Sequence, residues 1–431
     1  MGNKSNKEDK NKKNQNEDSN KIKIKEKINE NIVNYDSISC ILEKRCITSF
    51  TILRHNKLML TFKGGIIKVY ELINSNPNNN EIKINEIIEM ELDEYCFNYG
   101  IELKNGDLAV CSEDSTIKII QIIFDNDKNN DIKNNNEEKN LNSDTNTNNN
   151  NINNNKYLIK QNIEKGDDPL YIIKEFLKGE LVVGSWIYLY IFIKVPSINE
   201  YELINKIGID DRTFSLIELK KGEILSSQCY SKTLTIYNIK TNEISLIKGI
   251  ESNEHPNILC KYNNQNEIVF VAHDNGINIV SITHKCLMKN IIINEIVTSL
   301  CPLMIHLINK KSNPENIPEK FSLLCGVKKR VYGQKVNYYY NIIQYGFNLD
   351  DKSKNKGEII FDKDENKNIK CYEISEKERA QLNEINAIGN SIFLKNEILN
   401  INKNDQIIIS IGSEDRRLKL WKNKNDTVIK K

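Results

Sequence analysis

Short apolar runs of Ile, Val, Leu, Tyr and Phe alternate with polar residues along most of the chain, and Gly, Asn or Asp interrupts them. Alternation with a period of two puts the apolar side chains on one face of a β-strand, and the interrupting residues favour tight turns. The pattern therefore predicts a chain dominated by short strands. Residues 374–386 are the best candidate for an amphipathic helix.

The predicted strands recur in a common order. The stretches 101–122, 174–192 and 217–239 each contain a strand, a turn with Gly and an acidic residue, a second strand, a tight turn and a third strand. Three further stretches follow this template more loosely: 50–72, 258–282 and 392–421. A seventh stretch, 297–347, fits the template if residues 309–320 are an insertion.

A fourth strand follows most of these units. It is predicted at 82–90, 201–207, 243–250 and 286–292. Four-stranded units spaced by about forty residues indicate antiparallel sheets arranged radially, because one such sheet cannot cover its own apolar face. The last unit lacks a fourth strand, and residues 37–44 alternate in the right way to supply it. We therefore expect an all-β fold, a seven-bladed β-propeller of four-stranded antiparallel blades that an N-terminal strand closes into a ring.

Two short cassettes carry a family resemblance. Residues 412–415 (GSED) are followed by 418–421 (LKLW), and residues 112–114 (SED) by 117–119 (IKI). Through these residues the chain resembles the WD-repeat β-propeller family, although no Gly-His pair opens a blade and no Trp is followed by Asp. The resemblance implies a non-catalytic scaffold or adaptor for protein–protein interaction in a multiprotein complex.

The tight turn of each cassette contains an Asp whose carboxylate can accept hydrogen bonds from nearby backbone N–H groups. Asp114, Asp274 and Asp415 occupy this position. Because the same residue recurs from unit to unit, we expect a structural role for it and no catalytic one.

Composition and charge narrow the class of protein. The 431 residues include 61 Lys and Arg against 59 Asp and Glu, a net charge of +2, which gives no general attraction to nucleic acid or to an anionic membrane. The ten Cys residues contain no CxxC pair, so neither a disulfide scaffold nor a zinc ribbon is indicated. With no apolar leader and no long apolar run in the sequence, we expect a cytoplasmic protein, with the nucleus as the alternative.

Shifts in composition predict the domain organisation. Residues 1–34 are polar and Lys-rich, and half of residues 125–156 are Asn, so both segments are expected to be disordered. Residues 35–422 form the predicted propeller, in which 309–320 and 348–370 are long loops, and residues 423–431 form a polar tail.

Recognisable catalytic devices are missing from the sequence. The five His residues are scattered along the chain without the spacing of metal ligands, and there is no Gly-rich phosphate loop, GxSxG motif or HExxH motif. The sequence therefore predicts a protein that is not an enzyme and uses no cofactor or metal. The rival hypothesis, an enzymatic propeller, needs carboxylates or His residues gathered at the central channel.

Charged residues on one rim of the ring are the candidate partner-binding residues. In a propeller the segments that lead into the first strands and the turns between second and third strands share one face. Acidic pairs lead into units two to four, and basic groups are predicted in the turns of units six and seven. We hypothesise that an acidic arc beside a basic arc binds a protein of mixed charge; the alternative is ordinary solvated loop residues. The candidates are Asp167, Asp168, Asp210, Asp211, Lys328, Lys329, Arg330, Arg416 and Arg417.

Trp186 stands in the tight turn of unit three, where the repeat has Asp elsewhere. Two interpretations are open: an exposed aromatic anchor for a partner protein, or a side chain that fills the central channel or packs on its neighbour. Tyr338, Tyr339 and Tyr340 lie in an alternating run, which favours a half-buried strand over a platform on which bases stack.

The N-terminus offers an alternative function, that of a membrane-associated signalling propeller. Gly2 suits myristoylation, but the simple pattern has Ser or Thr at position six, where this chain has Asn6. Nine Lys residues within 1–27 are a second, electrostatic signal, which the acidic residues of the same segment weaken. We expect membrane contact only through this segment, and otherwise a monomer within a larger protein complex.

Overall fold

The computed structural model describes the strands and most of their connections: residues 35–76, 81–123, 157–164, 168–209, 211–219, 222–228, 233–247, 250, 258–261, 268–273, 276–292, 296–303, 320–331, 337–348, 369–373, 385–390, 407–412 and 416–423. The predicted disordered segments 1–34 and 125–156 lie outside these residues. So do residues 309–319 and 349–368 of the two predicted loops and all of the predicted tail except Asn423, which belongs to a strand.

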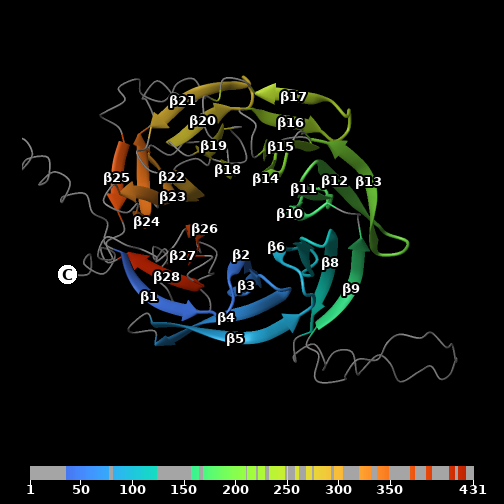
Figure 1. Cartoon of the computed structure of the whole chain (residues 1–431), viewed down its shortest axis with the longest axis horizontal. Helices are drawn as coiled ribbons and strands as arrows, with labels where there is room; N and C mark the ends of the chain where they lie inside the picture. The colour runs from blue at the N-terminus through green and yellow to red at the C-terminus, as the bar shows by residue number, and fades with distance from the viewer. Residues whose placement is uncertain are drawn as a thin grey trace, which may run out of the picture.

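The described strands form seven four-stranded antiparallel sheets, the blades of a β-propeller (Figure 1). Blade 1 consists of β2 (Ile47–Leu53), β3 (Lys57–Phe62), β4 (Ile66–Asn76) and β5 (Glu81–Glu91), and blade 2 of β6 (Phe97–Glu102), β7 (Leu108–Ser112), β8 (Thr116–Ile122) and β9 (Tyr157–Glu164). Blade 3 consists of β10 (Leu170–Glu175), β11 (Leu181–Ser185), β12 (Tyr188–Val195) and β13 (Glu200–Gly208), and blade 4 of β14 (Thr213–Glu218), β15 (Glu223–Gln228), β16 (Leu234–Asn238) and β17 (Ile244–Ile247). Blade 5 consists of β18 (Ile258–Lys261), β19 (Ile268–His273), β20 (Gly276–Ser281) and β21 (Cys286–Ile292), and blade 6 of β22 (Ile296–Leu303), β23 (Lys320–Val331), β24 (Asn337–Asn348) and β25 (Ile369–Glu373). Blade 7 consists of β26 (Ile385–Asn390), β27 (Ile407–Gly412), β28 (Arg417–Asn423) and β1 (Tyr35–Leu42).

The ring is closed in the way that the sequence predicts. The innermost strands β2, β6, β10, β14, β18, β22 and β26 contact one another in this order, and β26 contacts β2 in turn. Strand β1 pairs antiparallel with β28, with Cys40 opposite Lys419, and so supplies the fourth strand of blade 7. Closure by β1 gives β28 a partner and covers an edge that an open ring would leave exposed.

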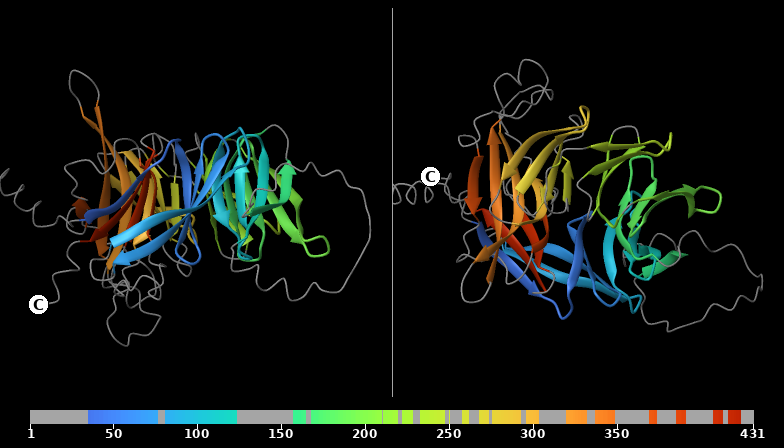
Figure 2. Two further views of the ribbon diagram at one scale, coloured as in Figure 1. Left: turned by 90° about the horizontal axis from the view of Figure 1, so that it is seen from below. Right: turned by 45° about the horizontal axis from the view of Figure 1, so that its top comes forward.

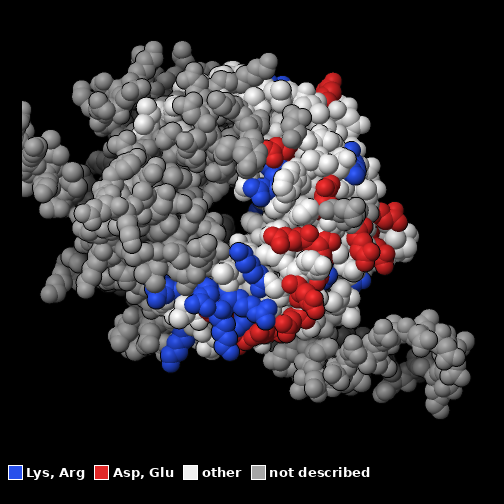
Figure 3. Space-filling model, viewed as in Figure 1, with Lys and Arg blue, Asp and Glu red and all other residues white. Residues whose placement is uncertain are grey.

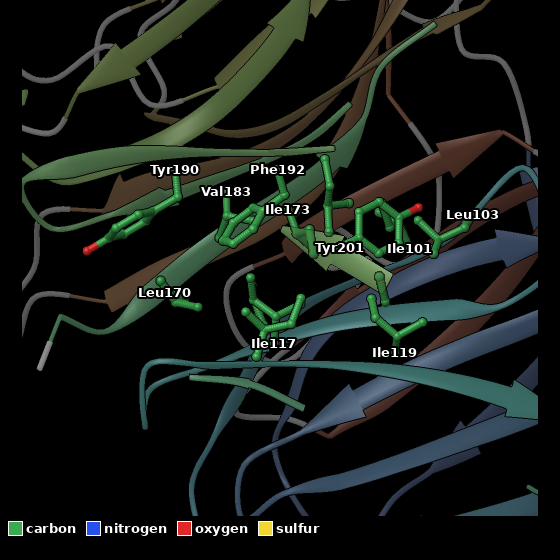
Figure 4. Packing of buried hydrophobic residues seen from close by; sticks show 14 residues of the cluster. Ile101, Leu103, Ile117, Ile119, Leu170, Ile173, Val183, Tyr190, Phe192 and Tyr201 are labelled. Atoms are coloured by element: carbon green, nitrogen blue, oxygen red, sulfur yellow. The ribbon is translucent and has the colours of Figure 1, made fainter. Parts of the chain in front are cut away.

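Apolar side chains from neighbouring blades form the cores between them. Figure 4 shows the core between blades 2 and 3, where Ile117 and Ile119 of β8 lie in one buried cluster with Ile173, Val183 and Phe192 of β10 to β12. Complete burial of such side chains contributes about 1.5–3 kcal/mol each. Each blade therefore obtains from its neighbours the core that a single sheet cannot provide.

A repeated carboxylate links successive blades on the face that carries the turns between first and second strands, here called the lower face. The last residue of β6, β10 and β14 is a Glu whose Oε2 accepts a hydrogen bond from a backbone N–H in the corresponding turn of the preceding blade. The pairs are Glu102 with Arg54 (2.8 Å), Glu175 with Lys104 (2.6 Å) and Glu218 with Leu177 (2.7 Å). These bonds explain why the sequence repeats Glu at the end of the first strand.

The structure differs from the prediction at the first strand of blade 7, at the predicted helix and at two fourth strands. The first strand of blade 7 is β26 at Ile385–Asn390, and no described strand begins at residue 392. Residues 385 and 386 of the predicted helix belong to that strand, and residues 374–384 lie outside the described part of the chain. Two fourth strands were not predicted: β9 of blade 2, which the Asn-rich segment separates from its partner β8, and β25 of blade 6, which includes residues 369 and 370 of a predicted loop.

Candidate functional site: the upper face of the ring

The lead-in segments, which precede the first strands, lie on the same face as the turns between second and third strands. In blade 1 the start of β2 pairs with the end of β3, Ile47 opposite Phe62, and the start of β4 pairs with the end of β5, Ile66 opposite Glu91. We call this face the upper face. It is turned toward the viewer in Figures 1 and 3.

Exposed basic and acidic side chains lie side by side on the upper face of blades 7, 1 and 2 (Figure 3). The basic group consists of Lys44, Arg45, Lys63 and Arg416, and the acidic group consists of Glu91, Glu94 and Glu113.

Hydrogen bonds hold two of the basic side chains in place. Arg45 Nη1 donates to the Gly64 carbonyl oxygen at 3.1 Å, and its Nη2 lies 3.5 Å from Glu91 Oε1. Arg416 Nη1 donates to the Lys44 carbonyl oxygen at 3.0 Å. These bonds orient two guanidinium groups on the surface before any partner arrives.

The lead-in carboxylates have a structural use that the sequence reasoning missed. Asp93 Oδ2 lies 3.1 Å from Lys118 Nζ on the third strand of blade 2. Burial opposes the charged form of Asp93, but the contacts with Asp114 and Lys118 outweigh it and lower the pKa of Asp93 to about 2. Asp93 therefore remains charged and fastens its segment to the blade.

Blades 1 and 3 use the same position of the third strand in the same way. Lys68 Nζ lies 3.2 Å from Glu43 Oε2, and the pKa of Lys68 is raised because its contacts with Glu86, Glu43 and Glu89 outweigh the opposing effect of burial. In blade 3, burial and the Asp168 carboxylate raise the pKa of Tyr190. Lead-in acids thus face Lys68, Lys118 and Tyr190, which stand at equivalent register positions.

The tight-turn Asp of blade 2 has the predicted structural role. Asp114 Oδ1 accepts hydrogen bonds from the Thr116 N–H at 2.9 Å and from the Thr116 hydroxyl at 2.7 Å. Ser115 between them adopts a left-handed conformation, with φ of 69°. Asp274 and Asp415 lie outside the described residues.

The predicted basic arc differs from expectation in its secondary structure. Lys328, Lys329 and Arg330 lie within strand β23, opposite Tyr340, Tyr339 and Tyr338 of β24, and not in a turn. Strand β22 begins opposite Lys328, so the hairpin extends beyond it and projects from the ring (Figure 2). The hairpin is longer than expected because pairing continues to Val331 and Asn337. Arg417 likewise begins strand β28, whereas Arg416 is in the turn with φ of 56°.

Four acidic candidates remain, in the segments that lead into the innermost strands β10 and β14. Asp167 and Asp210 lie outside the described residues. Asp168 and Asp211 are half-buried, and Asp211 Oδ1 accepts a hydrogen bond from the Arg212 N–H at 2.6 Å.

Trp186, in the turn between β11 and β12, is 50% exposed and stands beside an arginine surrounded by aromatic rings. The Arg212 Cζ atom lies 4.7 Å from the centroid of the Phe214 ring, 5.0 Å from that of Tyr171 and 5.9 Å from that of Trp186. Phe214 is 39% exposed. We call these four residues the Arg212 aromatic cluster; the sequence reasoning singled out Trp186 and missed the other three.

In the described part of the chain, no group of three or more His, Cys, Asp or Glu residues could hold a metal ion. No helix among the described residues is long and apolar enough to cross a membrane.

Comparison with known proteins supports the fold alone. No family model matches the sequence, and no curated protein matches it. A chain in the crystal structure of a mitotic checkpoint complex is similar to this one with a TM-score of 0.55 and 9% sequence identity, over 90% of this chain and 94% of that chain. The repeated four-stranded antiparallel sheets fit a WD-like propeller, and membership of the WD-repeat family stays a prediction.

Proposed function

We propose that this chain is a non-catalytic propeller that serves as an interaction scaffold or adaptor and binds partner proteins through its upper face. The proposal is supported above all by the exposed basic group beside the acidic group on that face. A closed ring presents these groups on segments that folding has already ordered, so a partner does not have to order them on binding. The structural neighbour is part of a protein complex, which agrees with such a role.

Charges of both signs on this face are expected to speed the association of a partner and to orient it, and to add less to the affinity. Exposed charges are screened by salt over about 8–10 Å at physiological ionic strength. We therefore expect partner association to slow as the salt concentration rises, with a smaller change in the dissociation rate.

The test is affinity purification of the full chain followed by mass spectrometry, with charge-reversal variants. Lys44→Glu with Lys63→Glu changes exposed residues of the upper face, and Lys178→Glu with Lys240→Glu is the matched control on exposed residues of the lower face. The proposal expects a set of proteins that the upper-face variant loses and the control retains. Identical recoveries from all three proteins would contradict it.

A second reversal tests the predicted basic arc separately. Lys328, Lys329 and Arg330 are changed to Glu together, and each protein identified is then purified and titrated directly against wild type and variants. If Lys328–Arg330 take part in binding, this variant weakens the same partners as the upper-face variant does. If only the upper-face variant does so, the binding surface is confined to blades 7, 1 and 2.

A further inference from the structure

A regular distortion of the innermost strands shows where blades 3 and 4 depart from the repeat. Strands β2, β6, β10, β14 and β26 each shift register after their first residue, and β22 shifts after its second, so that the next residue forms a bulge. A bulge re-aims the side chain of the extra residue. The bulge residues are Thr48, Asn98, Tyr171, Phe214, Thr298 and Asn386.

In blades 1 and 2 the bulge residue bonds to the next blade. The Thr48 hydroxyl donates to the Phe97 carbonyl oxygen, and Asn98 Nδ2 donates to the Leu170 carbonyl oxygen at 2.7 Å. Each acceptor is the first residue of the next innermost strand. A small polar side chain at the bulge therefore stabilises the blade interface, by about 1 kcal/mol for a typical hydrogen bond.

Blades 3 and 4 have aromatic residues at the bulge. Phe214 has no group that could donate this hydrogen bond, and Tyr171 and Phe214 both stand against Arg212. Their rings are half-exposed or exposed, as is Trp186 from the neighbouring turn. A position that serves the interface in other blades here places apolar surface in solvent, and natural proteins break a local rule in this way mainly at functional sites.

The composition of the Arg212 aromatic cluster is that of a binding hot spot. Trp, Tyr and Arg are the residue types most enriched at such sites, which cluster near the centre of an interface. Because the bulges lie at the upper ends of the innermost strands, the cluster is beside the mouth of the central channel. Asp168 and Asp211 stand two residues before the first residues of β10 and β14, and Figure 3 shows acidic groups gathered over this side of the face.

We propose that the Arg212 aromatic cluster binds an extended segment of a partner protein, in which an apolar side chain packs on the rings of Trp186 and Phe214 and an adjacent Lys or Arg faces the surrounding carboxylates. The inference rests on the proposed function and adds to it the place and chemistry of one binding site. Charge complementarity selects a basic segment over an acidic one.

The repeat itself supplies a mild test variant. Tyr171→Thr with Phe214→Asn introduces the residue types that blades 1 and 2 carry at the same bulge, where they fit and bond to the next blade. We expect this double variant to unfold at the wild-type midpoint or above it. The matched control is Leu177→Ser, which removes an apolar side chain that is 80% exposed on the lower face.

The probe is a displayed library of random peptides, selected on the full-length wild-type chain, from which the enriched sequences are synthesised. The chain's two tryptophans make the measurement direct, because Trp186 is half exposed and Trp421 is fully buried. Binding is expected to shift the Trp186 emission to shorter wavelength. The affinity should fall at least about tenfold in the double variant, as for loss of a hot-spot side chain, and stay unchanged in Leu177→Ser.

The inference is supported if the enriched peptides combine an apolar residue with adjacent Lys or Arg and behave as described. Acidic peptides, equal affinity for the double variant, or a lowered unfolding midpoint of that variant would overturn it. Concentration-dependent dimerisation of wild type that the double variant loses would also overturn it, because a second copy would then cover the cluster. Peptides lost only from the Lys44→Glu and Lys63→Glu variant would refute this site and leave the proposed function standing, whereas a chain that binds no peptide and no protein would refute both.

Discussion

The seam between the first and last blades depends on a buried carboxylate whose removal we expect to be costly. Glu43 follows the closing strand β1 and is 7% exposed. Its Oε1 accepts a hydrogen bond from the Tyr70 hydroxyl, and its Oε2 lies 3.2 Å from Lys68 Nζ. Burial and the neighbouring Glu43 raise the pKa of Tyr70 well above its ordinary value, so the hydroxyl remains a donor across the usual pH range.

The magnitude follows from what each substitution leaves behind. Glu43→Ala leaves the buried Tyr70 hydroxyl without this acceptor, which costs about 1–3 kcal/mol, and removes a charge-assisted contact of similar size. Lys68 keeps Glu86 at 2.9 Å and Glu89 at 3.2 Å, so its charge stays compensated. We therefore expect a loss of about 3 kcal/mol in the free energy of unfolding for Glu43→Ala and about half of that for Glu43→Gln, which preserves an acceptor.

Urea unfolding followed by Trp421 fluorescence measures this loss, because Trp421 is fully buried in β28, the strand that β1 joins. Glu89→Ala is the matched control. Its carboxylate contacts the same lysine but is 47% exposed, and an exposed pair contributes about 0–1 kcal/mol. A double-mutant cycle with Tyr70→Phe isolates the hydroxyl–carboxylate interaction. If Glu43→Ala costs no more than Glu89→Ala, or if the cycle shows no coupling, the seam argument is wrong.

Three further predictions concern the loops. Gly65→Ala places a Cβ 2.1 Å from the Asp93 carbonyl oxygen, at a φ of +66°. The free energy of unfolding, measured in urea, should therefore fall by at least about 2 kcal/mol. The loss should be smaller for Gly106→Ala, where the added Cβ meets open space. Because the pKa of Asp93 is lowered to about 2, the stabilisation that its charge provides is complete above the unfolded value near 3.9 and is lost as the pH falls toward 2. The free energy of unfolding should therefore depend less on pH between about pH 4 and 2 in Asp93→Asn than in wild type. An unchanged slope in urea unfolding at these pH values would refute this. Glu218→Ala removes the acceptor of the Leu177 N–H and should accelerate hydrogen exchange of that amide while costing about 1 kcal/mol or less.

Alternation and repeat spacing were enough to predict the blades and the closure of the ring, because both depend on local pattern and on the need to cover apolar faces. The exceptions have physical reasons. Strand β9 is mostly exposed, with Ile163 as its buried apolar residue, so it carries little alternation to detect. Residues 385–390 and the run from 392 both carry apolar side chains, and the pairing of Ile385 with Gly412 shows that residues 385–390 form the first strand.

The candidate site was less predictable because it depends on contacts between segments far apart in the sequence. A run of lead-in carboxylates looks the same in the sequence whether each acid faces solvent or contacts a buried lysine, so the sequence alone cannot tell a surface charge from a structural one. The structure separates the two cases: Asp93 contacts Lys118, whereas Glu94 is exposed. A signal was present in the Lys of the third strands at positions 68 and 118, because a charged residue at an otherwise apolar position requires a partner.

Equivalent positions in different blades serve as internal controls on which features are structural. Where the same residue type makes the same contact around the ring, as Glu102, Glu175 and Glu218 do, the fold itself is a sufficient reason for it. Where two adjacent blades replace a bonding side chain by a half-exposed and an exposed aromatic ring, the fold supplies no such reason, because the Thr and Asn of blades 1 and 2 fit the same bulge. The contrast between Thr48 and Asn98 on one side and Tyr171 and Phe214 on the other therefore supports the proposed binding site more strongly than exposure or charge alone.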